Sequence, residues 1–247
     1  SCDWSSDVCS SDLKPLLEAI GREMNISVSG VENFDPDTPT LLVANHACLR
    51  DVFAIPAALP EACKVVLSAR LAYKNSTPET AKRRTMIEDA LSAIPLEVHG
   101  GKERLQIGLE MAKQALNDGW STLIFPEGAY TGEAQVTKGR TGASRILFSA
   151  REAGKVRLLP VGITYDPWPT DLDAYLPQPE EISVVIGEPI NYEAALADYK
   201  NASDREAARR ALRAPIDMAM RAIADSTGLP YIDEAIKLKF VDRKSVV

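Results

Sequence analysis

Short apolar runs alternate with longer helical stretches through most of the chain, and this alternation constrains the fold more than any single motif. Strands that are separated by helices of about 10 to 20 residues run parallel in one sheet, because such a crossover carries the chain back across it. The strand-like runs are residues 40–45, 65–67, 121–125, 158–165 and 182–186, and the helical stretches are residues 51–59, 77–92, 103–118, 142–153 and 204–225. We therefore predict an α/β fold with a mostly parallel central sheet flanked by helices.

The middle of the chain shows no division into two domains. No linker, repeat or low-complexity run interrupts residues 26–230, and a composition of 45% hydrophobic and 26% charged residues suits one sizeable core. At the start of the chain, Ser-Ser-Asp occurs twice in a stretch without helical or strand periodicity. We predict a single domain over residues 14–240, with non-native or disordered segments at 1–13 and 241–247. Any native membrane anchor upstream would then lie outside this sequence.

One of the two histidines stands directly after the first predicted strand. His46 follows the apolar run 40–44, and Asp51 comes five positions later. A carboxylate that accepts the Nδ1–H of an imidazole fixes its tautomer and leaves Nε2 to take a proton from a hydroxyl near neutral pH. The pair can meet if His46 lies on the loop and Asp51 in the first helical turn, where negative charge is favoured. On its own, this spacing favours a buried histidine beside an unrelated N-capping aspartate.

A second strand ends in a segment of unusual residues, Phe125-Pro126-Glu127-Gly128. Loops at strand ends often build binding sites, and glycine permits backbone conformations that other residues avoid. Glu127 is suited to bind ligand hydroxyls or to order its loop, and a plain turn residue is the alternative. Two strand ends that carry such residues predict one site.

The order of these segments resembles the lysophospholipid acyltransferase family, whose best-known members are the 1-acylglycerol-3-phosphate acyltransferases. The resemblance covers residues 26–190 and implies a glycerolipid acyltransferase-like fold. Three segments match the family's catalytic block, its acceptor-binding block and a late block, in that order: Asn45-His46 with Asp51, Phe125-Pro126-Glu127-Gly128, and Leu159-Pro160-Val161.

The resemblance implies an enzyme that moves a fatty acyl group from acyl-CoA or an acyl carrier protein to a lysophospholipid hydroxyl in phospholipid synthesis. The expected acceptor is 1-acylglycerol-3-phosphate. His46 would be the general base and Asp51 would orient it, while Asn45 and residues 125–128 would bind substrate. The thiolate needs little acid help to leave, because a thiol has a pKa of about 8.5. Backbone N–H groups of residues 46–51 are candidates for stabilising charge on the carbonyl oxygen.

Departures from the family pattern bear on the acceptor. Tyr130 stands where an arginine usually follows the Glu-Gly pair. Lys102 and Arg104 are both candidates for the arginine that holds the acceptor phosphate in the family's second block. Lys138 and Arg140 are candidates to restore positive charge near residues 127–130. Another lysolipid, such as the lyso form of an amino-acid lipid, fits the missing arginine about as well.

Cys48 stands where the family usually has a serine, two residues after the histidine. A thiol beside an imidazole suits nucleophilic catalysis, so a thiol-dependent acyl hydrolase is the rival activity. The other histidine, His99, is expected to be incidental.

Composition excludes some function classes and sets the expected partners. A net charge of −7 argues against a general nucleic-acid binder. The four cysteines lack metal-ligand spacing, so we expect no metal and no cofactor beyond the acyl donor. No stretch approaches the roughly 18 apolar residues of a membrane span. Because both substrates are amphiphilic, we expect peripheral association with the cytoplasmic face of the cell membrane. The basic run 82–84 is either a solvated helix face or a contact for anionic headgroups or a carrier protein.

Overall fold

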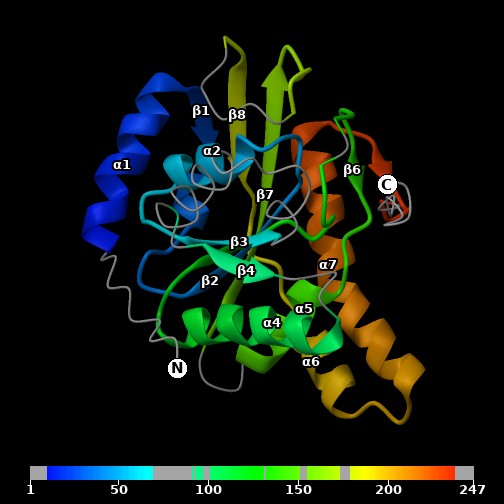
Figure 1. Ribbon diagram of the computed structural model, residues 1–247. Helices are drawn as coiled ribbons and strands as arrows, with labels where there is room; N and C mark the ends of the chain where they lie inside the picture. The colour runs from blue at the N-terminus through cyan, green and yellow to red at the C-terminus, as the bar shows by residue number, and fades with distance from the viewer. Residues whose placement is uncertain are drawn as a thin grey trace, which may run out of the picture.

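A mostly parallel sheet forms the centre of the protein, of which the computed structural model describes residues 10–68, 91, 93–96, 101–130, 132–150, 155–172 and 179–236. Within these residues seven strands form one sheet in the order β1-β8-β7-β2-β5-β3-β4 (Figure 1). Their bounds are β1 Asn25–Ser29, β2 Thr40–Ala44, β3 Lys64–Ser68, β4 Ile94–Leu96, β5 Thr122–Ile124, β7 Arg157–Asp166 and β8 Glu181–Ile186. Neighbouring strands pair in parallel except β7 and β8, which are antiparallel.

Helices cover both faces of the sheet, which confirms the predicted fold class. One hydrophobic cluster joins the sheet to α1 and α2, and a second joins the other face to α4, α5, α6 and α7. In Figure 1, α1 (blue) and α7 (orange) lie on opposite sides of the strands. The helices are α1 Ser10–Glu23, α2 Asp51–Ala58, α4 Lys102–Asn117, α5 Gly142–Ala150, α6 Glu193–Lys200 and α7 Arg205–Thr227, with a short 3₁₀ turn, η1, at Val31–Asn33.

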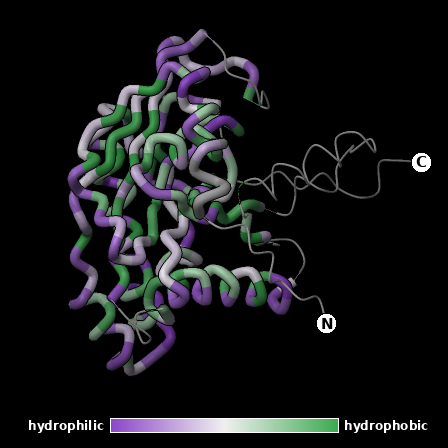
Figure 2. Tube along the Cα trace, turned by 90° about the vertical axis from the view of Figure 1, so that its left-hand side faces the viewer, coloured by the Kyte–Doolittle hydropathy of each residue, from purple (hydrophilic) through white to green (hydrophobic). Residues whose placement is uncertain are grey.

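β2 lies in the middle of the sheet, and all of its residues are buried. Leu42 and Ala44 belong to the cluster under α1 and α2, whereas Leu41 and Val43 belong to the cluster on the other face. A strand covered on both faces is continuously apolar instead of alternating, which is why the run 40–44 predicts a strand. Figure 2 shows hydrophobic residues along the inner strands and hydrophilic residues toward the outside.

The amphipathic pattern of residues 103–118 is confirmed, because Leu109, Ala112 and Leu116 are buried on the inner side of α4. At the start of the chain, α1 begins at Ser10, inside the segment predicted as a leader, so residues 10–13 are helical. The extent and origin of that leader, and the tail at 241–247, stay predictions. Most of the helix predicted at 77–92, the basic run 82–84 and His99 lie outside the described residues.

Several short elements have no counterpart in the sequence prediction. They are α1, α6, β1 and β4, together with a two-stranded sheet of β6 (Val136–Thr137) and β9 (Tyr231–Ile232). None of the helices in the described part of the chain is long and apolar enough to cross a membrane.

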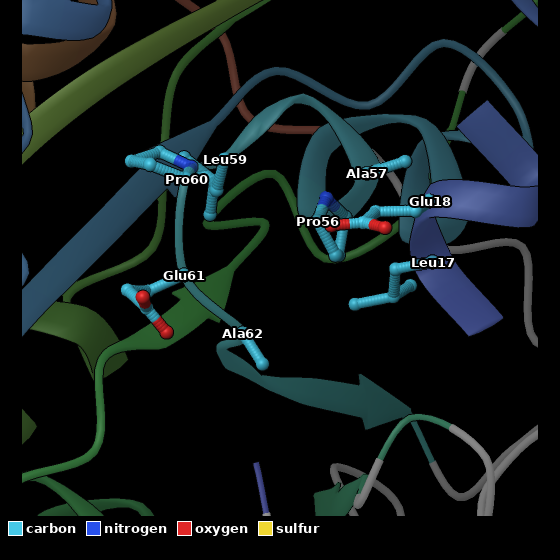
Figure 3. A pocket seen from close by; sticks show the side chains of 8 residues that line it. All are labelled: Leu17, Glu18, Pro56, Ala57, Leu59, Pro60, Glu61 and Ala62. Carbon is cyan, nitrogen blue, oxygen red and sulfur yellow. The ribbon is translucent and has the colours of Figure 1, made fainter. Parts of the chain in front are cut away.

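A hollow of about 340 Å³ opens between α1 and the end of α2 (Figure 3). Because α2 has eight residues, it is about 12 Å long. It begins near the carboxyl end of β2 and ends before β3 begins, so the hollow lies toward the opposite edge of the sheet from His46. None of the predicted site residues lines it. The lining residues are Leu17, Glu18, Pro56, Ala57, Leu59, Pro60, Glu61 and Ala62.

α7 packs directly on β7 at a glycine. A Cβ atom placed on Gly162 would overlap the Cγ2 methyl of Thr227, the last residue of α7. The absence of a side chain at Gly162 therefore lets this helix approach the strand.

We expect Gly162→Ala to lower the free energy of unfolding by about 1 to 3 kcal/mol, the usual cost of overpacking. Adding Thr227→Ser should recover most of the loss, because serine lacks the methyl group that the new Cβ would overlap. Serine also keeps a hydroxyl that can donate to the Ile223 carbonyl oxygen, as Thr227 does at 2.7 Å. Urea denaturation measures both variants. The matched control is Gly142→Ala, since a Cβ there would meet only Leu109 Cδ2, at 3.8 Å. Equal stability of the Gly162 and Gly142 variants would contradict the packing argument.

Candidate active site

The carboxyl ends of three neighbouring parallel strands meet at one edge of the sheet. β2 pairs with both β5 and β7, so the residues that follow β2 and β5 lie beside the last residues of β7. His46 follows β2 by two residues, Phe125 follows β5 directly, and Tyr165 is the penultimate residue of β7. Open α/β sheets bind ligands at the carboxyl ends of their strands, so this edge is where a site is expected.

The structure brings together the two residues predicted to be catalytic. His46 Nδ1 lies 2.8 Å from Asp51 Oδ2, across the junction between β2 and the first turn of α2. Asp51 is fully buried, and the same oxygen accepts the backbone N–H groups of Ala47 at 2.6 Å and Cys48 at 3.0 Å. A carboxylate held by several donors keeps its position, and here it accepts the Nδ1–H of His46. The ring nitrogen left to take a proton is Nε2.

Aromatic side chains hold the imidazole of His46. Phe125 stacks on it with a centroid distance of 4.1 Å and an interplanar angle of 18°, and Tyr130 meets it edge-on at 5.0 Å. Only 12% of the His46 side chain is exposed. Tyr130, which stands where the family usually has an arginine, is thus a neighbour of the proposed base.

Glu127 connects the two strand-end loops from within the protein. Its Oε1 accepts the backbone N–H of His46 at 3.0 Å, and its Oε2 accepts both the N–H of Thr137 at 3.3 Å and the Thr137 hydroxyl. Glu127 is 1% exposed, and burial raises its pKa from 4.5 to about 7. The sequence predicts that Glu127 either binds ligand hydroxyls or orders its loop, and these contacts agree with the ordering of the loop.

Asn45 has its side-chain amide occupied by the backbone of β7. Its Nδ2 donates to the Ile163 carbonyl at 3.0 Å, and its Oδ1 accepts the Ile163 N–H at 2.9 Å. Asn45 is 1% exposed. The contacts therefore join β2 to β7 and are not the predicted contacts to a substrate.

The thiol of Cys48 is unsuited to nucleophilic attack. Cys48 is fully buried, and its Sγ donates to Asp51 Oδ1 at 3.7 Å. Burial and then the negative charge of Asp51 raise the pKa of the thiol to about 12. Because the thiolate is the reactive form, the geometry argues against the thiol-dependent alternative.

Five of the six backbone N–H groups proposed from sequence to stabilise an oxyanion donate to other groups of the protein. Residues 46–49 all donate to groups of the protein. Their acceptors, in chain order, are Glu127 Oε1, Asp51 Oδ2, Asp51 Oδ2 again and the Leu172 carbonyl. The N–H of Asp51 itself donates to the Cys48 carbonyl. These five amides therefore have acceptors within the protein, and the contact of residues 46–51 with a substrate oxygen stays a prediction.

Arg140 lies against the loop that carries Glu127. Its Nε is 3.4 Å from the Glu127 carbonyl oxygen, and its guanidinium also donates to the Ile236 carbonyl at 3.1 Å. Gly128 has a φ of 81°, and a Cβ there would come 2.9 Å from Arg140 Nε. Both the left-handed backbone and this close approach favour glycine.

The other cations proposed from sequence lie farther away or have other partners. Lys138 Nζ pairs with Asp233 at 2.9 Å. Lys102 and Arg104 are exposed in the first turn of α4, which follows β4. β4 is three strands from β2 in the sheet, so about 14 Å separates the two strands. The structure places Arg140, but not Lys102 or Arg104, beside the Glu127 loop.

Sequence reasoning missed three residues next to the proposed dyad. The Tyr165 hydroxyl donates to Asp51 Oδ1 at 2.6 Å. Arg50, 1% exposed, pairs with Glu180 at 2.8 Å. These partners lie 114 to 130 positions apart in sequence, so no local spacing indicates them. No cluster of candidate metal ligands occurs among the described residues.

The raised pKa of Glu127 predicts a pH-dependent stability. The folded state binds a proton that the unfolded state releases above pH 4.5, so this contribution is complete below 4.5 and is lost as pH rises through about 7. We expect wild type to lose up to about 3 kcal/mol of unfolding free energy relative to Glu127→Gln between pH 5 and 8.5. Urea denaturation across this range measures it. Glu206→Gln is the control: Glu206 is 81% exposed, and the stability difference between wild type and this variant should stay constant across the range. A difference between wild type and Glu127→Gln that also stays constant would contradict the prediction.

Comparisons with known proteins agree with the fold and with the family indicated by the motifs. The crystal structure of the 1-acyl-sn-glycerophosphate (LPA) acyltransferase PlsC from Thermotoga maritima is similar, with a TM-score of 0.54 and 20% identity, over 88% of this chain and 81% of that one. At that identity the similarity shows the fold. Among curated proteins, no match is found. The sequence model of the acyltransferase family matches residues 25–164, which is more than half of the sequence, and the chain belongs to that family.

Proposed function

We propose that this chain transfers a fatty acyl group from a thioester, acyl-CoA or acyl carrier protein, to the hydroxyl of a lysophospholipid. The observation that carries the proposal is the 2.8 Å contact between His46 Nδ1 and Asp51 Oδ2, which leaves Nε2 to act as a base. The fold shared with the PlsC protein supports 1-acylglycerol-3-phosphate as the first acceptor to test.

The reaction needs two proton transfers, to His46 and from it, and one substitution at the acyl carbon. His46 Nε2 takes the proton of the acceptor hydroxyl while the oxygen attacks the thioester carbonyl carbon. When the tetrahedral intermediate collapses, the C–S bond breaks, the thiolate leaves, and the imidazolium returns the proton to the thiolate or to water. Asp51 faces the positive charge that His46 carries between the two transfers.

Arg140 and Tyr130 bear on which headgroup the acceptor carries. Arg140 is the cation that lies against the Glu127–Gly128 backbone, so we assign it to an anionic headgroup. Tyr130 beside His46, in place of an arginine, favours a second candidate, the lyso form of an amino-acid lipid. Because such acceptors reside in membranes, we propose peripheral binding at the cytoplasmic membrane face.

His46→Ala should reduce acyl transfer by about 100-fold or more, because the general base is lost. Folding should persist, since Asp51 keeps its bonds from Ala47, Cys48 and Tyr165. The assay follows labelled acyl-CoA into product with a panel of lysolipids, including lysophosphatidate and a lyso amino-acid lipid. Alanine at His99, the chain's other histidine, is the control and should keep full activity. Undiminished transfer by the folded His46 variant would refute the mechanism.

Cys48→Ala should retain acyl transfer within about fivefold of wild type, because it removes a single weak hydrogen bond to Asp51. A thiol-dependent hydrolase would instead lose all turnover, since alanine offers no nucleophile. The measurement is the release of free fatty acid against the formation of acylated lipid, with wild type and Cys48→Ala side by side. Loss of both products in a folded variant would favour the thiol mechanism.

A further inference from the structure

The Tyr165 hydroxyl binds the oxygen of the Asp51 carboxylate that does not contact His46. The two oxygens of that carboxylate have different partners: Oδ2 receives His46 Nδ1, and Oδ1 receives the Tyr165 hydroxyl at 2.6 Å. Tyr165 is 6% exposed and comes from the end of β7, whereas Asp51 begins α2. The hydroxyl thus ties the helix that carries Asp51 to the sheet.

The Tyr165 ring is itself held in place. Arg50, the residue before α2, has its guanidinium carbon 5.6 Å from the ring centroid. Arg50 is fixed by its pair with Glu180 at 2.8 Å and by the Asp171 carbonyl at 3.4 Å. Trp168 meets the ring edge-on at 6.2 Å. The antiparallel pairing of β7 and β8 places Tyr165 opposite Ile182, which brings Glu180 to this end of the sheet.

Tyr165 acts as a donor and not as an acid or base. Burial, and then the negative charge of Asp51, raise the pKa of its hydroxyl above the ordinary value of a tyrosine, so the hydroxyl is protonated at neutral pH. An ionised carboxylate has no proton to give. The direction of the hydrogen bond from Tyr165 to Asp51 is therefore fixed.

We propose that Tyr165 is a positioning residue for the dyad: its hydroxyl holds the Asp51 carboxylate so that Oδ2 stays on His46 Nδ1. This inference rests on the proposed acyl transfer. Tyr165 acts through Asp51, and no contact of its own with substrate is required. Arg50 and Glu180 contribute indirectly, because they fix the ring of Tyr165.

The test compares two buried tyrosines whose hydroxyls each donate one short hydrogen bond, to a carboxylate from Tyr165 and to a backbone carbonyl from Tyr192. Tyr192 is also 6% exposed, and its hydroxyl also donates at 2.6 Å, to the Val156 carbonyl. It belongs to the hydrophobic cluster on the other face of the sheet. Tyr165→Phe and Tyr192→Phe each remove one buried hydrogen bond, and the loss of stability should be larger for Tyr165→Phe because its acceptor is charged. The kinetic constants and the pH profile of the folded variants therefore decide the test.

For Tyr165→Phe we expect kcat to fall by about tenfold or more with KM unchanged, the scale for partners that orient a reactive group. The acid limb of the kcat/KM profile should also move up by about half a pH unit, because a carboxylate with fewer donors holds a protonated imidazole more tightly. Tyr192→Phe should show neither change.

The groups that face the dyad must be the same in both variants for this pH comparison to be valid. They come from the loop before α2, from the loop after β5 and from the start of β8: Cys48, Arg50, Glu127, Tyr130 and Glu180. Both substitutions leave all of these intact.

The outcomes separate this inference from the proposed function. If Tyr165→Phe and Tyr192→Phe share one kcat and one pH profile while His46→Ala is inactive, the positioning role is wrong and the proposed function stands. If His46→Ala keeps its activity, the proposed function fails. A kcat loss and an acid-limb shift confined to Tyr165→Phe support the positioning role.

Discussion

A single buried carboxylate organises the site. Asp51 is removed from solvent and accepts the ring of His46, two backbone amides and the hydroxyl of Tyr165. A buried charge is tolerated only when donors surround it, so the loop 46–50, the start of α2 and the end of β7 must take up these positions together. The donors that surround the aspartate thereby also determine where the imidazole of His46 lies.

Glu127 extends this arrangement toward the second loop. It binds the amide of His46 on one side and Thr137 on the other, so it connects the loop after β2 to β6. The segment that contains Thr137 is in turn fixed from outside: β9 pairs with β6, and Arg213 of α7 donates to the Gly139 carbonyl. Elements far from the histidine in sequence thereby determine how its loop is held.

The sequence predicts what periodicity and order encode. Buried strands such as β2 and the stripe on α4 follow from local patterns, whereas the His46–Asp51 contact is predicted only when the order of the motifs along the chain is added. Short edge elements such as β1 and β4 carry too little periodicity to be recognised. Tyr165 and Glu180 cannot be predicted from spacing, because the sheet alone brings them to Asp51 and Arg50. The acceptors of the amides of residues 46–49 cannot be predicted either, because the sequence shows that these donors exist but not which acceptors they find.

The backbone origin of two Asp51 donors has a consequence for variation among homologues. The amides of Ala47 and Cys48 bind the carboxylate whatever side chains those positions carry. The hydrogen bonds to Asp51 therefore exclude proline at these two positions, because proline has no N–H. The buried space excludes side chains that are too large for it. A small residue such as serine or cysteine at position 48 meets both conditions. Positions 47 and 48 can therefore vary in identity while the geometry that their amides create is preserved.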